Sequence, residues 1–79
     1  MKVNDLFVII KEALLLNREV CLEDSIETIE QWDSLSQLDI LVRIDRSVDG
    51  RAAKIRELAT AVSVEKLITV LKENNLLDG

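Results

Sequence analysis

Gln31-Trp32-Asp33-Ser34-Leu35 marks the start of a helix that we expect to continue to Val48, with Gly50 after it as a left-handed C-cap residue. Asp33 is a good N-cap, because its carboxylate can accept hydrogen bonds from the free amides of the first turn. Ser34 then stands at the first helical position, where the positive end of the helix dipole favours a phosphate group. Apolar side chains follow at helical spacing, mostly along one face: Leu35, Leu38, Leu41, Val42 and Val48.

Helical patterns also occur on both sides of this helix. We expect a first helix over residues 4–16, capped by Asn4, and a short helix over residues 51–58. A last helix begins after the N-cap Ser63 and ends at Asn74-Asn75, with an apolar tail behind it that can fold back.

Residues 17–32 connect the first two helices and lack a sustained period. We predict a long ordered connection, held on the helices by its apolar residues. Connections longer than ~12–15 residues are uncommon in compact domains and are often functional. Cys21, the only cysteine, is interpreted as a small apolar side chain that fills space in this connection.

The composition favours an all-α fold in a single domain, residues 1–79. Apolar residues make up 48% of the chain and aromatic residues 3%, so Leu, Ile and Val must fill the core. There is no proline and there are only two glycines, which argues against a chain of tight turns and hairpins. We therefore predict a small antiparallel four-helix bundle, built from three longer helices and one short helix.

The residues around Ser34 resemble the acyl carrier protein family. Asp33-Ser34-Leu35 matches the Asp-Ser-Leu triplet of that family, and the apolar residues that follow it, the chain length and the long first connection match the family's layout. In that family the serine carries a 4′-phosphopantetheine arm, derived from coenzyme A, whose thiol holds an acyl or aminoacyl group as a thioester. The resemblance implies that Ser34 is the attachment residue, with Asp33 and Leu35 beside it, and that the fold is the family's helical bundle.

The resemblance also implies a set of partners. A phosphopantetheinyl transferase would supply the arm, an acyl- or aminoacyl-activating ligase would load it, and synthase or transferase enzymes would accept the cargo. The chain would be a phosphoprotein that acts with separate enzymes rather than an enzyme itself. A short cargo would lie between the second helix and the short third helix, against apolar side chains of both: Leu41, Val42, Ile44, Ile55 and Leu58.

Four charged residues of the second helix, with Trp32, are candidates for partner recognition. Asp39 and Asp45 occupy positions where fatty-acid carriers place acidic recognition residues, but Arg43 and Arg46 interrupt the acidic face. Residues 43–57 contain five basic and three acidic side chains, whereas residues 1–42 contain three basic and nine acidic ones. Without a binding role, these charged residues would form a solvated helix face with an Asp39–Arg43 ion pair. The functional interpretation is a changed partner surface, which favours a specialised lipid, polyketide or secondary-metabolite pathway over general fatty acid biosynthesis.

Trp32 has two interpretations at this point. Its ring either covers apolar surface where the connection meets the bundle, or it contacts partner enzymes or the arm.

Several other functions are disfavoured. A net charge of −5 argues against a nucleic-acid binder, and no apolar run approaches the ~18 residues of a membrane span. The chain contains no histidine, which removes Ser-His and Cys-His nucleophilic systems and histidine metal sites, and the acidic residues lack calcium-loop spacing. We therefore expect no metal. One cysteine and no signal-peptide layout predict a cytoplasmic protein, which we expect to be a monomer.

Two alternatives stay open. An aminoacyl or peptidyl carrier for a ligase or a nonribosomal system has the same outline as an acyl carrier. An unmodified helical adaptor would instead dock partner proteins through its acidic connection and its basic residues.

Overall fold

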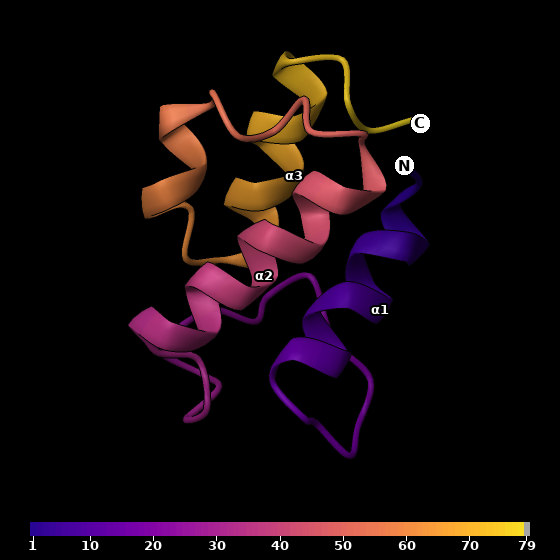
Figure 1. The fold of residues 1–79 in the computed structure, drawn as a ribbon. Coiled ribbons are helices and arrows are strands. Elements are labelled where there is room, and N and C mark those ends of the chain that lie inside the picture. Colours follow the sequence, from indigo (N-terminus) through magenta and orange to yellow (C-terminus); the bar gives the residue numbers. More distant parts are fainter. Residues whose placement is uncertain (79) are drawn as a thin grey trace.

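The computed structural model describes residues 1–78, and within them the chain forms three α-helices and one short 3-10 helix. These are α1 (Val3–Ala13), α2 (Ser34–Ser47), η1 (Arg56–Thr60) and α3 (Val64–Glu73). In Figure 1, α1 descends from the N-terminus whereas α2 and α3 rise, so α1 is antiparallel to both. α1 packs against α2, and η1 packs against both α2 and α3. The all-helical prediction is confirmed, since the described residues contain isolated bridges but no strand.

The short fourth α-helix predicted over residues 51–58 does not form. Residues 51–54 make turns instead, and only Arg56–Thr60 is helical, as a 3-10 helix. The Asp45 carboxylate accepts a hydrogen bond from the Ala52 amide at 3.0 Å, which holds the chain in a turn after α2. A segment this short cannot sustain an α-helix by itself, so the tertiary contacts decide its conformation. The predicted four-helix bundle is thus three α-helices and a 3-10 helix in the described chain.

Two of the predicted N-caps are confirmed and one is wrong. Asp33 and Ser63 each accept a hydrogen bond from the amide three residues further on, at 2.9 and 3.1 Å. Asn4, in contrast, lies inside α1, which begins after Lys2. The Asp5 carboxylate accepts from the Lys2 amide at 3.0 Å, and this contact places the start of α1 earlier than predicted.

α1, α2 and α3 all end in the same way. The residue after each C-cap has a left-handed backbone: Leu15 (φ 54°), Asp49 (φ 56°) and Asn75 (φ 59°). In all three cases the following amide donates to the carbonyl five positions earlier, at 2.8–3.0 Å, which is the Schellman arrangement. α1 therefore ends at Ala13 rather than at residue 16, because Leu15 leaves the helical conformation. Gly50 has the positive φ expected of it, 79°, but Asp49 rather than Gly50 follows the C-cap of α2.

The core lies between the three α-helices and includes both ends of the chain. The tail behind α3 folds back as predicted, since Leu76 and Leu77 are buried. The Asp78 amide donates to the Met1 carbonyl at 2.8 Å, which joins the two termini (Figure 1). The radius of gyration, 11.2 Å, is close to the ~12 Å expected for a compact domain of this length.

The buried face of α2 is not the one that its leucines predict. Leu35, Leu38 and Val42 are 78%, 60% and 47% exposed, and of the predicted apolar positions only Val48 is fully buried. The side chains that pack inward are Gln37, Ile40, Ile44 and Val48. Because α2 carries apolar residues on two faces, it packs through one and presents the other.

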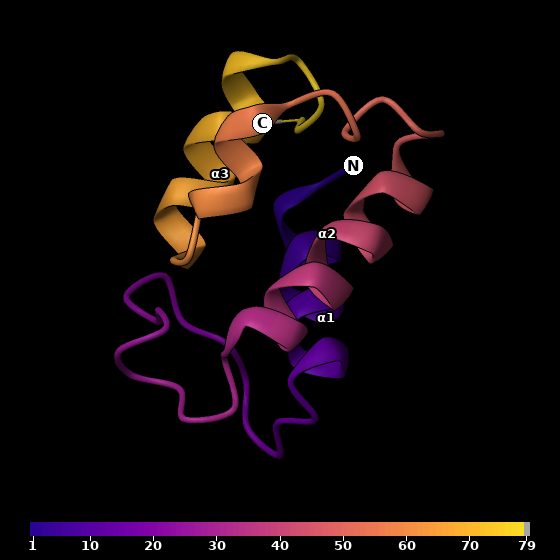
Figure 2. The ribbon, with the colours of Figure 1, turned by 60° about the vertical axis from the view of Figure 1, so that its left-hand side comes forward.

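The connection between α1 and α2 is ordered, as predicted, and a polar cluster holds it in addition to its buried apolar residues. The buried Asp24 accepts two hydrogen bonds from Arg18, at 2.9 and 3.1 Å, and others from the Cys21 amide and the Thr28 hydroxyl. The Arg18 guanidinium holds the pKa of Asp24 well below its usual range, at about 2. The Val64 amide donates to the Asp24 carbonyl at 3.0 Å, so the connection is also attached to the start of α3 (Figure 2).

Apolar residues contribute unevenly to this connection. Val20, Ile29 and Trp32 are buried, whereas Leu22 and Ile26 are 49% and 40% exposed. Cys21 is exposed, so its interpretation as a buried apolar side chain is wrong. The chain places Val20 in the core instead, and the backbone of Cys21 serves the Asp24 cluster. Among residues 1–78, no helix has the length and apolar character needed to cross a bilayer.

Candidate functional site

Ser34 is the first residue of α2, and its side chain is exposed. Among residues 1–78, no side chain or backbone group hydrogen-bonds its hydroxyl. The first turn of α2 contains no acidic side chain, and the carboxylate at the positive end of the helix dipole is that of the N-cap Asp33. An enzyme can therefore reach the hydroxyl, and a phosphodiester placed there would meet a favourable field.

Asp33 and Ser36 fix the backbone on either side of Ser34. Asp33 accepts from the Ser36 amide at 2.9 Å, and this hydrogen bond holds the pKa of the Asp33 carboxyl below its ordinary value. The Ser36 hydroxyl donates to the Gln31 carbonyl at 2.7 Å, which ties the end of the connection to the first turn of α2. Asp33 was predicted from the sequence as the N-cap, whereas the contact of Ser36 with Gln31 was not predicted.

Trp32 is a core residue. It is 2% exposed, and its Nε1 donates to Gln37 Oε1 at 2.8 Å. The Gln37 amide group donates in turn to the carbonyls of Leu58 and Ala61, at 3.0 and 3.1 Å. This burial supports the covering interpretation of the ring and corrects its assignment to partner recognition, because a partner cannot touch it in this conformation. Gln37, a polar residue on the inner face of α2, was not identified from the sequence.

An apolar groove begins at Ser34. Its first part, about 380 Å³, is lined by Asp33 and Ser34 together with apolar side chains from α2, from the connection and from the segment around η1: Ile26, Leu38, Leu41, Ala59 and Val62. The adjoining part, about 410 Å³, runs between α2 and η1 and shares Leu38, Leu41 and Ala59 with the first. Leu38 and Val42, which line it, are exposed, so a flexible chain could enter the groove from the side.

The groove includes most of the residues proposed from the sequence to shelter a cargo. Leu41, Val42, Ile55 and Leu58 line its second part. Ile44 does not, because it is fully buried on the opposite face of α2. Leu35 is 78% exposed beside Ser34, so it belongs to the surface and not to the core.

The four charged residues singled out on α2 have different environments. Arg43 Nε donates to Asp39 Oδ1 at 3.2 Å, which confirms the predicted pair, and an Arg43 nitrogen lies 3.7 Å from Glu12 of α1. Asp45 is partly buried and holds the turn after α2. Arg46 is exposed and has no ion-pair partner among the described residues. Arg46 is thus available to a partner or ligand, whereas Arg43 is occupied by two carboxylates.

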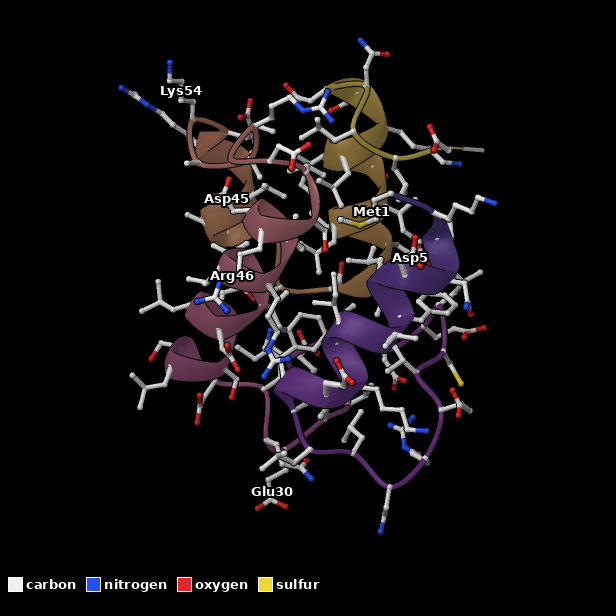
Figure 3. The ribbon with its side chains drawn as sticks, turned by 45° about the vertical axis from the view of Figure 1, so that its right-hand side comes forward. Met1, Asp5, Glu30, Asp45, Arg46 and Lys54 are labelled. Atoms are coloured by element: carbon white, nitrogen blue, oxygen red, sulfur yellow. The ribbon has the colours of Figure 1, made fainter. Side chains whose placement is uncertain are left out.

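The charges are separated in space as well as in sequence. Figure 3 shows Lys54 and Asp45 in the upper part of the view, Arg46 further down along α2, and Glu30, in the acidic connection, at the bottom. Of the basic residues after α2, Arg56 lines the groove, whereas Arg51 and Lys54 line a different surface hollow.

Residues 1–78 contain no group of three or more Asp, Glu or Cys side chains placed to hold a metal ion. Comparison of the chain with protein-family models, with curated proteins and with solved structures gave no match. Inferences about function therefore depend on the residues and geometry described above.

Proposed function

We propose that this chain is a carrier protein whose Ser34 is the attachment point of 4′-phosphopantetheine. The observation that carries the proposal is the position of Ser34, exposed at the first position of α2 and at the mouth of an apolar groove. Asp33-Ser34-Leu35 also resembles the carrier-protein triplet, in which the serine carries the arm. The chain acts with separate enzymes and carries out no catalysis itself.

The residues around Ser34 fit the proposed group. The amides of the first turn of α2 favour the phosphodiester, and Asp33 keeps that turn formed through its hydrogen bond to Ser36. When bound, the arm supplies a thiol that holds an acyl or aminoacyl group as a thioester. Tethering keeps the cargo at a high effective concentration near the groove, where the apolar side chains can exclude water from it.

For attachment, the chain itself supplies an exposed Ser34 hydroxyl and an ordered backbone around it. The activating base belongs to a phosphopantetheinyl transferase, which transfers the arm from coenzyme A to the Ser34 oxygen and releases adenosine 3′,5′-bisphosphate. Ser36 and Asp33 hold the serine in place for that enzyme, because each ties the first turn of α2 to the residues before it. We propose that the loading and accepting enzymes belong to a specialised acyl pathway, since the exposed cation on α2 differs from the acidic surface of fatty-acid carriers.

Intact-mass measurement tests the proposal. Incubation with coenzyme A and a phosphopantetheinyl transferase should add one arm to the wild-type chain and none to the Ser34→Ala variant. Ser47→Ala is the matched control, because Ser47 is an exposed serine at the other end of α2 and its loss should leave modification unchanged. A wild-type chain that stays unmodified with several transferases, or a Ser34→Ala variant modified equally well, would refute it.

A helical adaptor is the alternative that the exposed face of α2 favours. Leu35, Leu38 and Val42 form an apolar surface that a partner protein could cover, and Arg46 lies on the same helix. The adaptor hypothesis predicts that Ser34→Ala leaves function intact while charge reversal at Arg46 abolishes it. Arg43→Glu is a poor test, because this variant also breaks the contacts of Arg43 with Asp39 and Glu12. Carriage of aminoacyl or peptidyl groups is distinguished from acyl carriage by loading assays with activating enzymes.

A further inference from the structure

Gln37 is a polar side chain on the buried face of α2, with 6% of its surface exposed. Both polar atoms of its amide group are engaged. Oε1 accepts from Trp32 Nε1 at 2.8 Å, and Nε2 donates to the carbonyls of Leu58 and Ala61 at 3.0 and 3.1 Å. Gln37 also lines the first part of the groove, together with Ser34. One buried side chain therefore joins α2 to the connection before it and to the segment around η1.

Gln37 supplies the polar contacts between α2 and residues 55–61, the segment that contains η1. Among residues 1–78, no other hydrogen bond and no ion pair links α2 to this segment. Apolar packing supplies the rest, since Leu58 and Ala61 are 2% and 0% exposed. The position of the segment against α2 thus depends on two hydrogen bonds from one amide nitrogen and on the burial of these side chains.

The same segment closes the groove toward the core. Ile55, Leu58 and Ala59 line the groove between α2 and η1, and Leu58 does so while almost fully buried. A chain that went deeper than Leu58 would have to move the segment away from α2. That movement would break the hydrogen bonds from Gln37 to the carbonyls of Leu58 and Ala61. Leaving such buried groups unpaired costs more than the burial of one or two methylene groups gains.

We propose that Gln37 is a positioning residue that limits how deeply an acyl chain carried on Ser34 can enter between α2 and η1, and hence the length of chain that the protein shelters. This inference rests on the proposed function. Gln37 acts through the backbone of residues 55–61 and needs no contact with the thioester. Without it, only apolar contacts would resist displacement of η1, a 3-10 helix of five residues.

The test measures how the melting temperature depends on the length of the cargo. Acetyl, hexanoyl, octanoyl, decanoyl and dodecanoyl groups are loaded on Ser34 from the matching acyl-coenzyme A by a phosphopantetheinyl transferase, and intact mass establishes loading. Methylene groups sheltered in the groove stabilise the folded chain, whereas those left in water do not. The melting temperature of the wild type should therefore rise with cargo length and then reach a plateau. In Gln37→Met, which has a side chain of similar size without the amide, the plateau should begin about two carbons or more later.

Two further variants separate this role from a general loss of stability. Ile44→Val is the matched control, because Ile44 is fully buried on the same face of α2 and does not line the groove. It should lower the melting temperature for every cargo and leave the plateau at the wild-type length. Gln37→Asn keeps the amide group on a shorter side chain that cannot span the same contacts, so it should move the plateau as Gln37→Met does. It replaces Gln37→Met if circular dichroism shows that the methionine variant does not fold.

A second measurement needs no cargo. The Ala61 amide donates to the Leu58 carbonyl at 3.2 Å, so release of the segment from α2 should expose it. Its hydrogen exchange, followed by NMR in the unmodified chain, should be about tenfold faster or more in Gln37→Met than in Ile44→Val. The Leu67 amide, which donates to the Ser63 carbonyl at 3.0 Å, is the internal reference in α3 and should differ little between the two variants.

The outcomes distinguish the two proposals. A chain that is never loaded at Ser34 refutes the proposed function and this inference with it. A loaded chain whose plateau is the same in the wild type and in Gln37→Met, or whose melting temperature does not depend on cargo length, refutes only this inference. An equal shift of the plateau in Ile44→Val also refutes it, because general loosening would then explain the change. Equal exchange of the Ala61 amide in Gln37→Met and Ile44→Val would show that Gln37 does not hold the segment, and the inference would fail.

Discussion

The two faces of α2 carry similar apolar side chains in opposite surroundings. Ile40 and Ile44 on the inner face are completely buried, whereas Leu35 and Leu38 on the outer face are 78% and 60% exposed. The difference shows that hydrophobicity alone did not select the packed face. The inner face also carries Gln37, which connects Trp32 to the carbonyls before and after the end of η1.

The contrast between the two faces of α2 suggests that one face serves stability and the other serves binding. The inner face gives the fold its stability, while the outer face and η1 form the groove that begins at Ser34. Isolated exposed apolar residues are ordinary in proteins, but several along one helix mark a surface for binding. Substitutions on the two faces should therefore differ in their effects on stability and on loading.

The largest effect is expected at the inner face. Ile44→Ala should lower the free energy of unfolding by about 2–5 kcal/mol, because it leaves a cavity in a fully packed site. Urea denaturation, monitored by circular dichroism, measures the change. A loss below ~1 kcal/mol would show that α2 can repack through its outer face, and the distinction between the faces would fail.

An intermediate effect on the free energy of unfolding is expected in the connection between α1 and α2, which belongs to neither face of α2. The pKa of Asp24 is about 2 in the folded chain against 3.8 ordinarily, so the folded state binds fewer protons between these values. Its stabilisation, about 1–2 kcal/mol once the partial exposure of Arg18 is considered, should be complete above about pH 5 and should disappear as the pH falls toward 2. Comparison of Asp24→Asn with the wild type by urea denaturation should give a difference that shrinks over this range.

A pH-independent difference between Asp24→Asn and the wild type would contradict this assignment. Ile44→Ala is the control, since its destabilisation involves no titrating group and should persist at low pH.

The smallest effect on stability is expected at the outer face. Leu38→Gln should change the free energy of unfolding by about 0.5 kcal/mol or less, because the side chain is already 60% exposed. The same change should reduce contacts between an acyl cargo and the groove, since Leu38 lines both of its parts. NMR shifts of the Val42 and Ile55 methyl groups on loading with a hexanoyl arm, compared between the variant and the wild type, measure that loss. Strong destabilisation by Leu38→Gln would show instead that the outer face supports the fold.

The candidate site was predictable from the sequence only in part. Asp33 and Ser34 follow local rules, because an N-cap and the first helical position depend on a few adjacent residues. Burial of Trp32 was one of two interpretations from the sequence, but its hydrogen bond with Gln37 was not predicted, since that contact depends on how the connection packs against α2. The second ion pair of Arg43, with Glu12 of α1, likewise depends on how α1 packs against α2.

The residues alone predicted an all-helical chain, the start of α2, the cap of α3 and the folding back of the tail, because propensity, capping and periodicity act over short distances. They could not predict that residues 51–54 form turns, nor which face of α2 is buried. Both outcomes depend on contacts between segments distant in sequence. Gln37 reaches carbonyls 21 and 24 residues away, and it shares the buried face of α2 with Ile40 and Ile44, whereas Leu35 and Leu38 are exposed.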